Sequence, residues 1–138
     1  MTRDAPGPYP TRRRVLAGVA GLIGGGTATA HGAPVDAVAA SRLIGLMDAA
    51  SGPQAAALTR AYLAAHAADA ADPAGLLATL CRSIGLAPQT VAVAPRAMLD
   101  ACVEAASRRD FAAGDVVLLD GWCLSRTEAR LLALARVA

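Results

Sequence analysis

The feature that most limits how this chain can fold is its shortage of large apolar side chains. About a quarter of the 138 residues are alanine, and aromatic residues make up only 3%. Beyond residue 30 the aromatic residues are Tyr62, Phe111 and Trp122. Because alanine favours helices but buries little area, we expect closely packed helices around a thin core. Such a domain would gain stability by docking on another protein.

The first thirty residues have the features of an export signal. Arg12 and Arg13 lie in the stretch TRRRVL at residues 11–16, and residues 15–30 carry no charge. The run at residues 11–16 resembles the twin-arginine signature, which is read by the twin-arginine translocase. It departs from that signature at Val15, where phenylalanine is preferred. The pattern predicts export to the bacterial periplasm, and an ordinary secretory leader is the alternative.

The uncharged stretch predicts a leader and not a permanent membrane anchor. As a helix, residues 15–30 would span about 24 Å, which is short of a hydrocarbon core of roughly 30 Å. Ala28 and Ala30 place small side chains at the two positions that signal peptidases read, which predicts cleavage after residue 30. Residues 1–30 would then be the signal peptide, and residues 31–138 a single helical domain.

The charge of the predicted domain argues against nucleic acid as a partner. Residues 31–138 carry nine arginines and ten acidic residues, so their net charge is −1. The net charge of +2 on the whole chain therefore belongs to the leader. Binding of nucleic acid requires a clustered basic surface, and the sequence offers none.

Local capping and periodicity signals predict about five helices. The helices are expected to begin near Asp36, Pro53, Asp72, Arg96 and Ser125. Gly85 is expected to end the third helix, and residues 86–95 to form a loop or a short extended segment. The fourth helix is expected to end near residue 109, with two arginines in its last turn.

The most informative stretch follows the fourth helix. Asp120-Gly121 is a two-residue turn between apolar runs, which predicts a tight hairpin or an extended arm. Ser125 and Glu128 have the spacing of a capping box, which predicts a last, amphipathic helix. The fold class is therefore predicted as all-α, a small bundle of about five helices with at most one short hairpin or extended arm near the C-terminus.

The candidates for chemistry are few. Cys81, Cys102 and Cys123 lie 21 residues apart without a CxxC motif, so two of them could form a disulfide, or they are buried apolar residues. A cysteine nucleophile would need a histidine, and His66 is expected to be a solvated residue near a helix end. Thiol labelling would test that enzyme class.

His66, Asp69 and Asp72 form a candidate set of metal ligands in the sequence. Their spacing is i, i+3 and i+6, which places only the first two on one helical face, and Asp72 is expected to cap a helix. No nucleotide-binding, phosphate-binding, serine-hydrolase or zinc-protease motif occurs. We therefore expect no catalytic residue, metal or cofactor in this chain.

The C-terminal part resembles a known family. Residues 110–114 (DFAAG), 120–122 (DGW) and 124–130 (LSRTEAR) are similar to the small, gamma-type subunits of periplasmic flavin-dependent sugar and alcohol dehydrogenases, such as those for sorbitol, fructose and gluconate. The resemblance covers the leader and about the last 30 residues. It implies a non-catalytic small subunit that carries the twin-arginine signal for a large catalytic subunit, which holds the flavin.

These observations predict a non-catalytic small subunit or export escort of a cofactor-containing periplasmic oxidoreductase. Phe111, Trp122 and Leu124 are the expected contacts with the partner, with the last helix beside them. Trp122 could instead fill the core. The alternative function is a stand-alone periplasmic helical binding protein, with an apolar or weakly polar ligand between the third and fourth helices.

Overall fold

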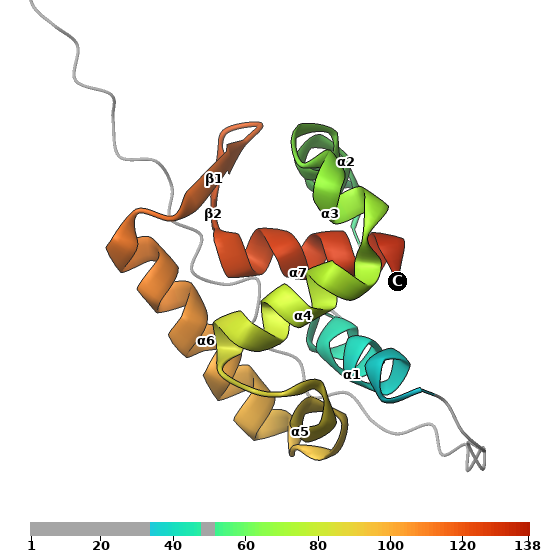
Figure 1. The fold of residues 1–138 in the computed structure, drawn as a ribbon. Helices are drawn as coiled ribbons and strands as arrows, with labels where there is room; N and C mark the ends of the chain where they lie inside the picture. Colours follow the sequence, from blue (N-terminus) through green and yellow to red (C-terminus); the bar gives the residue numbers. More distant parts are fainter. Residues whose placement is uncertain (1–33, 48–51) are drawn as a thin grey trace, which may run out of the picture.

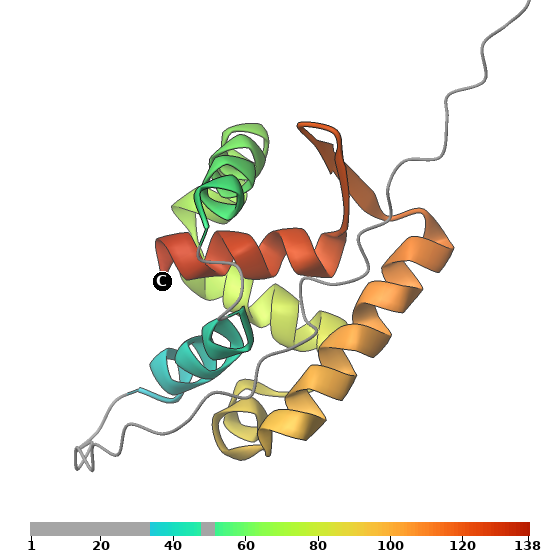
Figure 2. The same ribbon diagram turned by 180° about the vertical axis from the view of Figure 1, so that it is seen from behind.

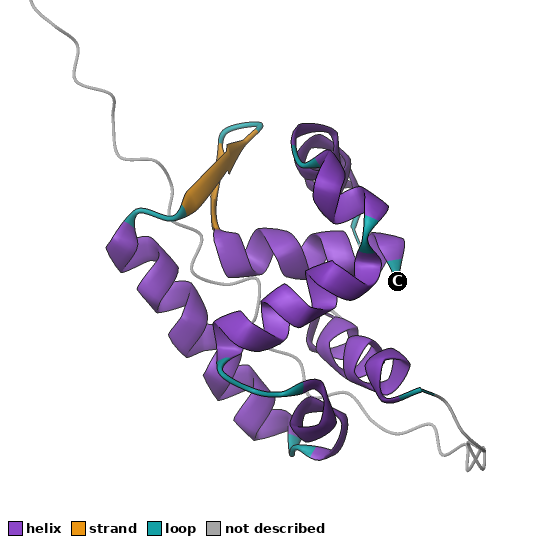
Figure 3. Ribbon diagram, in the orientation of Figure 1, coloured by secondary structure: helices purple, strands orange, loops and turns teal. Residues whose placement is uncertain are grey.

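The computed structural model describes residues 34–47 and 52–138, and its central element is the last helix, α7 (Arg126–Val137), drawn in red in Figure 1. The described residues also form six other α-helices, a 3-10 helix and an antiparallel hairpin. These elements are α1 (Val35–Ile44), η1 (Gly45–Met47), α2 (Pro53–Ala65), α3 (Ala67–Ala71), α4 (Pro73–Ile84), α5 (Pro88–Val93), α6 (Arg96–Ala113), β1 (Val116–Leu119) and β2 (Trp122–Ser125). The fold is mostly helical, but the hairpin means that it is not purely all-α (Figure 3).

Helix α7 lies inside the fold instead of on its surface. It contacts α1, α2, α3, α4, α6 and both strands. Ala129, Leu131, Ala133 and Leu134 are at most 1% exposed, so the central turns are covered on nearly every side. Ala129 and Ala133 let the neighbouring helices approach α7 closely. The last helix is amphipathic as predicted, with Ala135 and Arg136 exposed near its end, and its position beside a partner stays a prediction.

The buried apolar side chains of the described residues form a single cluster. It extends from Ala39 in α1 to Leu134 in α7 and takes members from every α-helix except α3, and from both strands. Tyr62 is its largest fully buried side chain. The core is otherwise built mainly of leucine, valine and alanine, as the composition of the chain predicts.

The start of α2 and both ends of α4 agree with the local signals. Pro53 occupies the first turn of α2, and Pro73 that of α4. The carboxylate of Asp72 accepts a hydrogen bond of 2.9 Å from the amide of Gly75, which satisfies one of the free amides at the start of α4. Gly85 ends α4 in the left-handed conformation, with φ of 74°.

Two predictions for other helix boundaries were wrong. Helix α1 begins after Pro34, so Asp36 lies in its first turn and does not cap it. The segment expected to be a loop contains α5, because Pro88 starts a helical turn and Val91 is fully buried where α5 packs against α1. The short α3 was also not predicted, and it contributes no buried residue.

Helix α6 is longer than predicted, and its buried stripe is narrower. It continues to Ala113, so Arg108 and Arg109 do not lie in its last turn. Arg108 pairs with Glu104, and Arg109 donates a hydrogen bond to a carbonyl of α4. The expected stripe member Met98 is exposed.

The predicted hairpin and capping box are both present. Asp120 and Gly121 have φ of 47° and 80°, the left-handed values that a two-residue hairpin turn requires. The amide of Glu128 donates to the Ser125 hydroxyl at 3.1 Å, and the Ser125 amide donates to the Glu128 carboxylate at 2.9 Å. The hairpin therefore leads directly into α7, because Ser125 is both the last residue of β2 and the cap of the helix.

Replacing Leu131 by alanine should destabilise the protein strongly, because this side chain is fully buried at the centre of the fold. We expect the free energy of unfolding to fall by about 2–5 kcal/mol, the range for leucine-to-alanine changes in cores. Urea unfolding measures this change. Leu118→Ala is the matched control, since Leu118 is exposed and its truncation should cost within about 0.5 kcal/mol. Equal losses in the two variants would contradict the central position of α7.

Candidate functional site

The three residues predicted to contact a partner lie on α6 and on β2 of the hairpin, but they are not equally accessible. Phe111, in the last turn of α6, is 40% exposed. Trp122 begins β2 and is partly buried against the core. Leu124 is only 5% exposed and packs among the core residues. The expectation that Leu124 contacts a partner therefore conflicts with its burial, whereas Phe111 and Trp122 retain accessible surface.

The outward face of the hairpin is apolar. The strand register places Val117, Leu119, Trp122 and Leu124 on the face that packs against the helices. Leu118 lies opposite Cys123 on the other face, and Leu118 is 62% exposed. A hairpin that packs one face on a core usually turns polar residues to water, so this exposed leucine is unusual. Sequence reasoning missed it because four consecutive apolar residues do not show which face is buried.

We call Phe111, Leu118, Trp122 and Cys123 the hairpin corner; Leu118 and Cys123 lie on the outer face of the hairpin, and Trp122 lies on its inner face and is partly buried. The end of α6 is fixed to the start of α7 there, since the Thr127 amide donates a 2.7 Å hydrogen bond to the carboxylate of Asp110. A second link joins the two ends of the hairpin at its base.

That second link is made by Asp115 and Arg126. Nε of Arg126 donates to the Asp115 carboxylate at 3.0 Å, and the Arg126 amide donates to the Asp115 carbonyl at 3.1 Å. The ion pair is partly exposed, so it contributes less than about 1 kcal/mol to stability. Its effect is to tie Asp115, which precedes β1, to Arg126, the first residue of α7.

A polar network lies between α2, α3 and the start of α7. We define it as Tyr62, His66, Asp69 and Arg126. The rings of Tyr62 and His66 stack with centroids 4.2 Å apart, and the tyrosine hydroxyl donates to the Asp69 carboxylate at 2.5 Å. His66 Nδ1 contacts the Tyr62 carbonyl at 3.0 Å, and Arg126 donates to His66 Nε2 at 3.0 Å. His66 was expected to be solvated, but the network holds both of its ring nitrogens.

The environment of Tyr62 makes it a persistent hydrogen-bond donor. Burial, the hydrogen bond to Asp69 and the negative charge of Asp69 together raise the pKa of Tyr62 from 10.0 to about 12, while Arg130 and Arg126 oppose them. With its pKa raised, the Tyr62 hydroxyl stays protonated at physiological pH and remains a donor to Asp69. The polar network therefore links α2, α3 and α7 through its hydrogen bonds and the stacked rings.

All three cysteines are free thiols in the structure. Cys81 is buried, and burial together with the charge of Asp36 raises the pKa of its thiol. Cys102 and Cys123 are partly exposed on different elements, α6 and β2. His66, the histidine considered as a partner for a cysteine nucleophile, is held by the polar network instead.

The metal pattern considered from the sequence is occupied by structural contacts. Asp69 accepts the hydrogen bond of Tyr62, and Asp72 caps α4. Within residues 34–47 and 52–138, no group of three or more metal-ligating side chains is arranged to hold an ion. In the same part of the chain, no helix combines the length and the hydrophobicity needed to cross a bilayer.

The export residues fall outside the described part of the chain. Arg12 and Arg13 of the expected twin-arginine signal, and Ala28 and Ala30 of the expected cleavage site, all precede residue 34. Their predicted roles remain predictions from the sequence.

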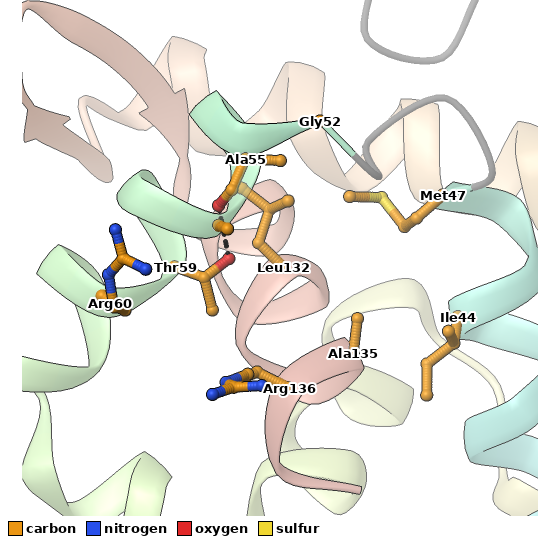
Figure 4. A pocket seen from close by; sticks show the side chains of 10 residues that line it. Ile44, Met47, Gly52, Ala55, Thr59, Arg60, Leu132, Ala135 and Arg136 are labelled. Carbon is orange, nitrogen blue, oxygen red and sulfur yellow. Dashed lines mark hydrogen bonds between the residues drawn. The ribbon is translucent and has the colours of Figure 1, made fainter.

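A pocket of about 420 Å³ opens at a place that the sequence did not indicate. It lies between the end of α1 with η1, the first half of α2 and the end of α7, as the close view in Figure 4 shows. The ligand site considered from the sequence was instead between the third and fourth predicted helices, which correspond to α4 and α6. The pocket was missed because its walls come from three separate parts of the chain.

No protein-family model matches this chain, and no curated protein or solved structure is significantly similar to it. The residues described above are therefore the basis for assigning a function.

Tyr62→Phe should remove the alkaline dependence of stability that the polar network produces. Because folding raises the pKa of Tyr62 from 10.0 to about 12, its contribution is complete below pH 10 and is lost as the pH rises through 12. The expected loss in the wild-type protein is roughly 1–2 kcal/mol, less than the full pKa rise implies because Asp69 is only partly buried. Denaturant unfolding at a series of alkaline pH values measures it.

The ionisation of Tyr62 can also be observed directly. The chain has two tyrosines, so Tyr9→Phe leaves Tyr62 as the single one, and its tyrosinate absorbance reports its titration. A midpoint near pH 12 is expected. A midpoint near pH 10 in the folded protein would show that the hydroxyl is not held as described.

Proposed function

We propose that this chain is an exported, non-catalytic subunit that docks on a larger, cofactor-containing oxidoreductase through the hairpin corner. In this proposal the leader directs the export of both proteins, and the large partner supplies the flavin. The resemblance of the C-terminal stretch to small dehydrogenase subunits supports the type of partner. The accessible apolar surface supports the mode of binding.

The exposed position of Leu118 carries the proposal. This exposed side chain lies on a strand of the two-stranded sheet, opposite Cys123, on the outer face where polar residues are usual. Exposure of a large apolar side chain costs stability in water, and burial of a leucine against a partner would recover about 1.5–3 kcal/mol. Phe111 and Trp122 add aromatic area, which is enriched in protein interfaces.

The geometry of the hairpin corner also suits docking. The links from Asp110 to Thr127 and from Asp115 to Arg126 fix the hairpin before any partner binds. A surface that is already ordered loses little conformational entropy on association, so more of the burial energy appears as affinity. Figures 1 and 2 show the hairpin at the end of the molecule away from α5, with α2 beside it, and α2 contacts β1.

The leader gives a reason for joining such a surface to this chain. The twin-arginine pathway exports proteins that are already folded, and Arg12 and Arg13 match its signature. A subunit that binds a folded, flavin-loaded partner in the cytoplasm could carry that partner through the same pathway. The export signal and the docking surface would then both serve the export of the folded partner.

Leu118→Arg should remove most of the partner from the protein while leaving the fold intact. A charge at this exposed position would be buried without a counter-charge in the complex, so we expect at least roughly tenfold less partner to co-purify. The measurement is a pull-down of the C-terminally tagged chain from its own host, with the flavin absorbance of the eluate. Thermal unfolding of the isolated variant checks that the fold persists.

Val93→Arg is the matched control for this experiment. Val93 is 79% exposed in α5, at the opposite end of the molecule, so the same charge there should leave co-purification unchanged. Equal recovery of partner with both variants would refute docking through the hairpin corner. Purification of the wild-type chain alone and without colour would refute the proposed function as a whole.

Replacing Arg12 and Arg13 by lysine should retain the chain and its partner in the cytoplasm. The translocase distinguishes arginine from lysine at the signature pair, although the charge is the same. Fractionation followed by immunoblotting of the tagged chain measures the distribution, with Arg3→Lys as a control outside the signature. Normal export of the double variant would contradict the twin-arginine assignment.

A further inference from the structure

Charged and apolar side chains line different sides of the pocket between η1, α2 and α7. Its lining is mostly apolar, and it holds two charged side chains, Arg60 from α2 and Arg136 from α7. In Figure 4 both arginines lie toward one side of the pocket, and Ile44 and Met47 lie toward the other. The pocket therefore has a cationic end and an apolar end.

The apolar end is built from the core of the protein. Met47 and Leu132 are both buried members of the hydrophobic cluster, and Ile44 packs against that cluster. The hydroxyl of Thr59 is not available to a ligand, because it donates a 2.8 Å hydrogen bond to the Ala55 carbonyl within α2. The guanidinium groups of Arg60 and Arg136 are therefore the charged groups among the described lining residues, and they are the main polar groups available to a ligand.

The two arginines carry positive charge without a nearby counter-charge in the lining. None of the described lining residues is acidic. Arg60 and Arg136 make no ion pair or side-chain hydrogen bond with another described residue, whereas Arg96, Arg108 and Arg126 each pair with a carboxylate. Two unpaired guanidiniums at the edge of an apolar pocket attract an anion, and the planar donors of arginine suit a carboxylate.

We propose that this pocket binds a small anionic amphiphile, with a medium-chain fatty carboxylate as its simplest ligand. The carboxylate would lie between Arg60 and Arg136, and the hydrocarbon tail would cover Ile44, Met47 and Leu132. The volume of about 420 Å³ lies within the range of about 300–1,000 Å³ that is usual for small-molecule sites. This site is separate from the hairpin corner, so the proposal does not depend on docking to an oxidoreductase.

The charge of the pocket selects among possible occupants. A cationic amphiphile would be repelled by the two arginines, and a neutral alcohol would gain only the burial of its tail. The chain's own leader is also a poor occupant at the charged end, because residues 12–14 are themselves arginines. The ligand class is therefore defined by a negative head group and an apolar tail.

Isothermal titration of the full chain with decanoate tests this proposal, with decanol and decyltrimethylammonium as matched probes. Decanoate should bind, decanol should bind at least roughly tenfold more weakly, and the ammonium probe should not bind. Arg60→Gln and Arg136→Gln should each weaken decanoate binding roughly tenfold. Arg82→Gln is the matched control, since Arg82 is an exposed arginine of α4 outside the pocket.

A second variant tests the apolar end without changing charge. Ala135 is exposed and lines the pocket, so Ala135→Trp should fill it and abolish decanoate binding with the fold intact. Equal binding of the three probes, or the same affinity in Arg60→Gln and Arg82→Gln, would overturn the proposal. Binding to phosphatidylglycerol vesicles that decanoate does not compete would also overturn it, because the arginines would then serve a membrane surface.

Discussion

The burial of α7 is the constraint on which the rest of this structure depends. Leu131 and Leu134 fill the centre of the fold, and Ala129 and Ala133 let neighbouring helices approach the same helix closely. This arrangement makes a usable core from a composition with few large side chains. Since the central turns of α7 are fixed by contacts from several directions, its first turn is also fixed, and with it the strand that leads into the capping residue Ser125.

The position of the hairpin follows from that first turn. Hydrogen bonds to Arg126 and Thr127 join the base of the hairpin and the end of α6 to α7, and the polar network joins the same arginine to α2 and α3. Each of these contacts contributes little stability, because most of the groups are partly exposed. Together they place Leu118 on an ordered surface and not on a mobile arm, which is what a docking surface requires.

Features with local causes could be predicted from the sequence. The cap at Asp72, the left-handed Gly85, the Asp120-Gly121 turn and the capping box each depend on residues within a few positions. The core position of α7 and the helix α5 depend on packing between distant segments, which periodicity alone does not determine. The same holds for the candidate sites: Tyr62 and Arg126 meet across 64 positions of the chain, and the exposure of Leu118 depends on which hairpin face packs. The pocket walls come from three separate segments, so no local motif indicates them.

The proposed binding of a large protein at the hairpin corner can be tested by site-specific photo-crosslinking in the native host. A photoreactive amino acid would be introduced at position 118, or at position 93 for comparison, and the irradiated adducts identified by mass spectrometry. We expect one large flavoprotein adduct from position 118 and no such adduct from position 93. Adducts that are the same from both positions, or the absence of any protein adduct from position 118 in cells that export the chain normally, would contradict it.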